Sequence, residues 1–122
     1  MTIQELYDRI GGNYAEIISR LQMDAFVSRF ITKFADDSSC HDTIAAWEAG
    51  DERGTFEAAH RAKGVCANLS LTKLANLSSD ICEAMRPGNE ELRARTDVDA
   101  LVAELRDSHA AALAAIAEFT AQ

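Results

Sequence analysis

The sequence predicts an all-α protein, an antiparallel four-helix bundle with short N-terminal helices packed over one end. Apolar residues recur at helical spacing along most of the chain, and no segment shows the sustained alternation of apolar and polar residues that indicates a strand. A single proline interrupts 122 residues, of which 48% are hydrophobic. Residues 1–122 are expected to form one helical domain. Its successive helices should pack as antiparallel neighbours, because short connections join them.

The N-terminal region predicts two short helices. Thr2 and Glu5 have the spacing of a capping box, so a helix is expected from residue 2 to residue 10, where a glycine pair ends it. Asn13 can cap the next helix, which is expected either to bend near Gln22 and Met23 or to continue through them. These segments are the predicted cover of the bundle.

A core helix is expected next. Its apolar residues are Phe26, Val27, Phe30, Ile31 and Phe34. They recur at the intervals of a helix that is buried along one face. Ser39 and Asp42 then have capping-box spacing and are expected to start a helix that carries Trp47 inward and ends at Gly50.

The central and C-terminal helices follow in order. Asp51 is the expected N-cap of the central helix, and Ser70 or Thr72 that of the next one, which ends before the turn at 86–89. Residues 90–95 fit either a loop or the frayed start of a helix. The capping-box spacing of Thr96 and Asp99 predicts a last helix of over twenty residues.

A histidine on the central helix is the candidate functional group. Its face of the helix holds Phe56, His60, Lys63, Gly64 and Ala67. His60 points away from the apolar stripe of this helix, and a neutral imidazole is a nucleophile that needs no activating base. Lys63 lies one turn further on, where an ammonium can oppose the charge of a phosphoryl group on the imidazole. Gly64 leaves space beside the ring, although glycine inside a helix costs about 1 kcal/mol relative to alanine.

The run Ala59-His60-Arg61-Ala62-Lys63-Gly64 resembles the Ala-His-x-Leu-Lys-Gly motif of histidine-containing phosphotransfer (HPt) domains. The resemblance extends from about Ile10 to Met85, with Ala62 where the family usually has leucine and Ser70 where it usually has glycine. It implies a phosphorelay protein that accepts a phosphoryl group on His60 from a receiver-domain aspartate and passes it to another receiver. Lys63 would stabilise the phosphoryl charge, and Gly64 would give steric clearance.

The resemblance also implies the partners, which are response-regulator receiver domains and a hybrid sensor histidine kinase. No cofactor is expected on this chain, because the receiver brings its own Mg²⁺ and catalytic lysine. The expected docking surface around the histidine consists of Phe56, Ala59, Arg61 and Ala67. For Phe56, burial and exposure are equally compatible with its position on the helix.

Composition narrows the other possibilities. A net charge of −8 and a pI near 4.7 argue against nucleic acid and anionic membranes as partners. No apolar run is long enough to cross a bilayer, so a cytoplasmic location is expected, and a monomer is expected for want of a spare apolar stripe. The three cysteines lack metal spacing, and a metal site from Cys40, His41 and His109 is disfavoured.

Two other function classes remain open at this stage. The first is a helical adapter that binds a signalling partner independently of phosphorylation, with His60 incidental. The second is a metal- or haem-binding bundle, which is weaker because the sequence lacks repeated Glu-x-x-His pairs and a Cys-x-x-Cys-His motif.

Overall fold

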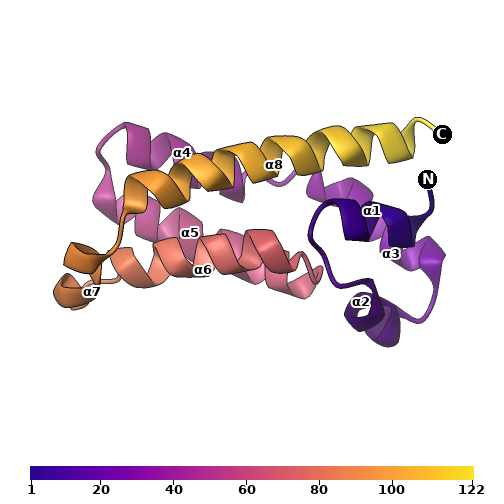
Figure 1. Ribbon diagram of the computed structural model, residues 1–122, viewed down its shortest axis with the longest axis horizontal. Coiled ribbons are helices and arrows are strands. Elements are labelled where there is room, and N and C mark those ends of the chain that lie inside the picture. The colour runs from indigo at the N-terminus through magenta and orange to yellow at the C-terminus, as the bar shows by residue number, and fades with distance from the viewer.

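A computed structural model of the chain describes residues 1–122, which form eight α-helices and no strand (Figure 1). The helices are α1 (Ile3–Arg9), α2 (Tyr14–Leu21), α3 (Asp24–Phe34), α4 (Ser39–Glu48), α5 (Glu52–Asn68), α6 (Thr72–Met85), α7 (Glu90–Arg95) and α8 (Val98–Thr120). The predicted all-α class is confirmed.

Helices α4, α5, α6 and α8 form the bundle. Helix α5 packs against both α4 and α6, and α8 closes the bundle by packing against α6 and α4. Helices α1, α2 and α3 gather at the end where α8 finishes, and α7 lies at the opposite end (Figure 1). The short N-terminal helices therefore cover one end of the bundle, as the sequence predicts.

One hydrophobic core runs through both parts of the molecule. Leu6 and Tyr7 of α1 and Ile17 of α2 are fully or almost fully buried, and they belong to the same cluster as Leu105 and Ile116 of α8. Removing this apolar surface from water is the main favourable contribution to folding. The N-terminal helices are thus part of the folded core rather than appendages to it.

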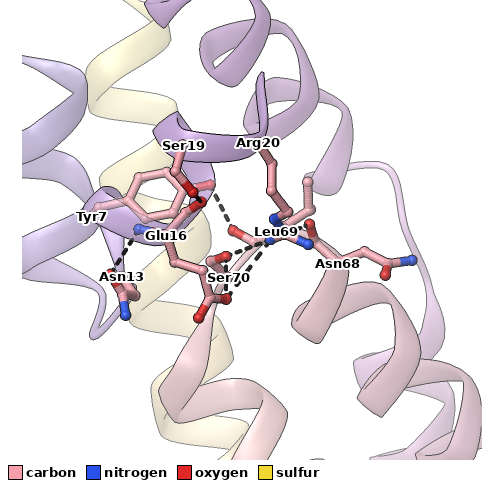
Figure 2. A network of polar contacts seen from close by, with 8 residues as sticks. All are labelled: Tyr7, Asn13, Glu16, Ser19, Arg20, Asn68, Leu69 and Ser70. Atoms are coloured by element: carbon pink, nitrogen blue, oxygen red, sulfur yellow. Dashed lines mark hydrogen bonds and ion pairs between the residues drawn. The ribbon is translucent and has the colours of Figure 1, made fainter. Parts of the chain in front are cut away.

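The turn between α5 and α6 is held by a polar network from α1 and α2 (Figure 2). Ser70 has a φ of 55°, a left-handed conformation that non-glycine residues rarely adopt. Its hydroxyl accepts from Arg20 Nη2 at 2.6 Å and donates to Glu16 Oε1 at 2.7 Å, while its carbonyl accepts from the Asn13 N–H at 2.8 Å. Neither Ser70 nor Thr72 caps α6, because Ser70 is used in this turn and α6 has no side-chain cap.

Two further bonds join the same turn to the N-terminal helices. The buried Tyr7 hydroxyl donates to the Leu69 carbonyl at 2.8 Å, and Arg20 donates to the Asn68 carbonyl at 3.0 Å (Figure 2). These carbonyls lie at the C-terminal end of α5, where helical carbonyls lack intrahelical partners. The network therefore fixes the end of α5.

Three predicted helix starts are confirmed. Thr2 and Glu5 form both bonds of a capping box, with the Glu5 N–H donating to the Thr2 hydroxyl at 3.1 Å and the Thr2 N–H donating to the Glu5 carboxylate at 3.0 Å. Asn13 and Asp51 cap α2 and α5 through their side-chain oxygens. Local sequence spacing was sufficient to find these positions.

Helix α4 begins at Ser39, as predicted, but the expected capping box of Ser39 and Asp42 does not form. The Ser39 N–H donates to the Asp37 carboxylate at 2.9 Å, so Asp37 satisfies the first turn. Asp42 instead accepts from the Ser38 hydroxyl at 2.9 Å. Asp37, two residues before Ser39, therefore bonds the helix terminus in place of the expected pair of Ser39 and Asp42.

The predicted capping residue of α8 is wrong by one position. The Ala100 N–H donates to the Asp97 carboxylate at 3.0 Å, whereas Thr96 does not cap the helix. The Asp99 carboxylate is engaged elsewhere, since it accepts from Trp47 Nε1 at 2.7 Å and so joins α8 to α4. Residues 90–95 form the separate helix α7, which is neither the loop nor the frayed helix start that was expected.

The burial predicted for α3 holds for only part of its apolar face. Val27, Ile31 and Phe34 are buried, but Phe26 and Phe30 are 41% and 42% exposed. Both lie on the edge of the stripe, which is only partly covered. The premise that the molecule has no spare apolar surface is therefore incorrect, and the predicted monomer loses that support.

We expect Tyr7→Phe to lower the free energy of unfolding by about 1 kcal/mol, because it leaves the Leu69 carbonyl without its donor. Burial raises the pKa of Tyr7 to about 12 from its usual 10.0. The protonated hydroxyl therefore contributes fully to the free energy of unfolding below pH 10, and this contribution is lost as the pH rises toward 12. Urea unfolding at neutral and alkaline pH measures both effects. Tyr14→Phe is the matched control, since that hydroxyl bonds the carboxylate of Asp24 at an exposed site. An equal loss in both variants would contradict the assignment.

Candidate functional site

Small side chains on α5 set the direction of its outer face. The buried residues of this helix are Thr55, Ala58, Ala59, Ala62 and Cys66. Alanine at three of these positions lets α4 and α6 approach α5 closely. The opposite side of the helix, which carries His60, is left at the surface.

His60 lies exposed in the middle of α5, as predicted. Its ring stacks on Phe56, with 6.2 Å between ring centroids and an interplanar angle of 27°. Nδ1 faces Cys82 of α6, whose Sγ lies 4.0 Å away, whereas Nε2 has no partner within the protein. The ring is therefore held against the bundle wall on one edge, and the nitrogen on its other edge is free to react.

Two cations lie beside the histidine, and both are paired with one carboxylate of α6. Lys63 Nζ is 3.7 Å from Glu83 Oε1. Arg86 reaches the same carboxylate through Nε at 3.1 Å and Nη2 at 3.0 Å, a bidentate contact. The guanidinium of Arg86 also lies 5.2 Å from the Phe56 ring centroid. Arg86 is thus tied to the aromatic ring on which His60 stacks.

The charge states of the α6 residues follow from these contacts. The hydrogen bond from Arg86 lowers the pKa of Glu83, and the nearby positive charges of Arg86 and Lys63 act in the same direction, so this carboxylate is ionised at neutral pH. Burial raises the pKa of the Cys82 thiol, which therefore stays protonated. The surroundings of His60 contain one anion and two cations.

Sequence reasoning missed these α6 residues. Glu83 was given no role, and Arg86 was predicted only as part of the turn at 86–89, where the structure does place it. Cys82 and Glu83 lie in the last turn of α6, and Arg86 follows directly after the helix. That this end of α6 lies near His60 depends on how α6 packs against α5.

The predicted docking residues lie in different environments. Ala67 and Arg61 are exposed. Arg61 Nη2 lies 3.4 Å from Oδ2 of Asp42 on α4. Phe56 is partly buried beside His60. Ala59 is fully buried, so its place on a partner surface was wrongly predicted. Its side chain belongs to the face of α5 that packs into the bundle.

Gly64 faces open space, because a Cβ built at this position would meet no atom within 4 Å. The fold itself therefore does not require glycine here. Any need for clearance must come from a molecule that approaches His60.

No metal centre or membrane span is formed by the described residues 1–122. No group of three or more His, Cys, Asp or Glu side chains is arranged to hold a metal ion, and the three cysteines are buried and free. No helix is both long enough and apolar enough to cross a bilayer.

A family model described as the Hpt domain matches residues 26–116, which include all four bundle helices through most of α8. The match covers three quarters of the chain and contains His60, Lys63, Glu83 and Arg86. No curated protein and no solved structure gave a significant match.

We expect Gly64→Ala to raise the free energy of unfolding by about 1 kcal/mol, because alanine is the better helix former and its methyl group meets open space. Urea unfolding measures the change. Gly54→Ala on the same helix is the control, since its methyl group would collide with the capping carboxylate of Asp51 and offset the gain. If both variants gained equally, the difference in local space between the two glycines would be unimportant.

Proposed function

The chain belongs to the Hpt domain family, which implies histidine phosphotransfer within a phosphorelay, and on that premise we propose that His60 carries the phosphoryl group. The observation that carries the proposal is the position of this side chain. It is exposed in the middle of a rigid helix, with Nδ1 toward the bundle and Nε2 unpartnered. Lys63 lies one helical turn further along α5, and Arg86 lies on the Phe56 ring against which His60 stacks.

In the proposed transfer, Nε2 of the neutral imidazole attacks the phosphorus of an aspartyl phosphate on a receiver domain. The N–P bond forms while the P–O bond to the aspartyl group breaks, and the carboxylate leaves with the electron pair. The proton on Nδ1 stays in place, so the step needs no general base on this chain. Transfer to a second receiver is the same reaction in reverse.

Catalysis on this side consists mainly of positioning and charge neutralisation. Helix α5 holds the ring, because its N-terminus is capped by Asp51 and its C-terminal end is fastened by the network around Ser70. Lys63 supplies positive charge to the phosphoryl oxygens. Gly64 leaves room for the partner beside the ring.

The proposed partners are response-regulator receiver domains and a hybrid sensor histidine kinase, with Mg²⁺ bound on the receiver. The docking surface is the exposed part of α5 around His60, with Phe56, Arg61 and Ala67. Its local positive charge contrasts with a net charge of −8 and suits an acidic phosphorylation pocket. A cytoplasmic location fits such partners.

We expect His60→Gln to abolish phosphorylation, because it replaces the nucleophilic nitrogen with an amide of similar size. Intact mass after incubation with a phosphorylated receiver domain, or with a small phosphoramidate donor, should show one acid-labile phosphoryl group on the wild type and none on the variant. A wild type that takes up no phosphoryl group from any active receiver would support the adapter function instead. Labelling of the variant would show that another residue is the acceptor.

We expect Gly64→Leu to slow transfer from a receiver by a factor on the order of 100, because a side chain at this position displaces the incoming aspartyl phosphate. Labelling by phosphoramidate should persist, since a small donor needs less clearance. Rapid mixing with a phosphorylated receiver measures the first rate, and intact mass measures the second. Loss of both reactions together would indicate damage to His60 itself rather than a lost partner approach.

A further inference from the structure

Glu83 stands out because one carboxylate pairs with both cations beside the proposed phosphoryl acceptor. It accepts two N–H groups from Arg86 and lies 3.7 Å from Lys63 Nζ. It comes from α6, whereas Lys63 and His60 come from α5. The cations that would meet a phosphoryl group are therefore already occupied in the unphosphorylated protein.

These ion pairs are strong enough to position the side chains and weak enough to exchange. The side chains of Glu83, Lys63 and Arg86 are 37%, 40% and 39% exposed. At such exposure water screens the attraction, so each ion pair stabilises the fold only weakly. One carboxylate also leaves a net positive charge when shared between two cations, so an arriving anion finds an attractive field.

We propose that Glu83 is a resting counter-ion that a phosphoryl group on His60 displaces from Lys63 and Arg86. The inference rests on the proposed function, and it assigns Glu83 a regulatory role at the same site. In the resting state, Glu83 holds the two cations. In the phosphorylated state, they pair with the phosphoryl oxygens, which carry more negative charge than the carboxylate.

Arg86 is placed for such an exchange. Its guanidinium lies on the Phe56 ring, and Phe56 in turn stacks on His60. Its Nη2 is also 3.9 Å from the Cys82 sulfur, which faces His60 Nδ1. These contacts hold the guanidinium between Phe56 and Cys82, the two side chains that contact the imidazole, while its carboxylate partner changes.

The consequence of this competition is that Glu83 lowers the stability of the phosphoryl group on His60. Competition for the cations, together with repulsion between the carboxylate and the phosphoryl group, destabilises phosphohistidine relative to the aspartyl phosphate of a receiver. Since coupling is reciprocal, phosphorylation also weakens the contact of Glu83 with Lys63 and Arg86. Glu83 thus favours release of the phosphoryl group and keeps transfer reversible.

The test is the transfer equilibrium of the full chain. The chain is first labelled with phosphoramidate and then mixed with a receiver domain that exchanges phosphate with the wild type, and both phosphorylated species are measured at the plateau. We expect Glu83→Gln to shift the equilibrium about fivefold toward phosphohistidine, because the competing charge is gone. The shift should shrink as salt is added, since it is electrostatic. A purely structural role would not produce a gain.

Two controls make the result specific. Glu48→Gln removes one carboxylate from an ion pair with Arg106 on the α4–α8 side and should leave the equilibrium unchanged. In a chain that also carries Lys63→Gln and Arg86→Gln, the shift caused by Glu83→Gln should be smaller than in the wild-type background, because only the direct repulsion between the carboxylate and the phosphoryl group remains to be removed. An unchanged or lowered phosphohistidine fraction in Glu83→Gln would overturn the inference while leaving the function of His60 intact. A wild type that takes no label on His60 would overturn both.

Discussion

The close packing of α5 between α4 and α6 is the constraint on which the site depends. One face of this helix consists of alanines, a threonine and a cysteine, and it is buried in the bundle. The other face must then be exposed, and it carries the histidine. The same packing brings α6 alongside, so the core that stabilises the bundle also supplies the thiol, the carboxylate and the guanidinium around the imidazole.

The N-terminal helices matter to the site although they lie outside it. Through Tyr7, Glu16 and Arg20 they bind the turn in which Ser70 adopts a left-handed conformation. A serine there costs more than a glycine in backbone strain, but its hydroxyl both accepts and donates a hydrogen bond within the network. A glycine would relieve the strain and lose these bonds. The end of α5 is thereby fixed by contacts that join distant parts of the sequence.

Charge is arranged on two scales. The chain as a whole carries −8, which opposes association with other acidic molecules at long range, while Arg61, Lys63 and Arg86 concentrate positive charge near the histidine. Each of these cations has a carboxylate partner on a neighbouring helix or turn. The exposed aromatic residues Phe26 and Phe30 form a separate feature, an uncovered edge of the core helix α3.

The sequence by itself determined the helical class, most of the core, three helix caps and the placement of His60 with Lys63 one turn away. These features follow from spacing along a single helix, because a period of 3.6 residues fixes which side chains are neighbours. Only the tertiary structure decided that Cys82 faces the ring, that Glu83 and Arg86 pair near it, that Ala59 is buried, and that Phe26 and Phe30 are partly exposed. These outcomes depend on which helix covers which face. A periodic pattern marks an apolar stripe, but the width of the stripe that a neighbour covers is set by packing between helices that are distant in sequence.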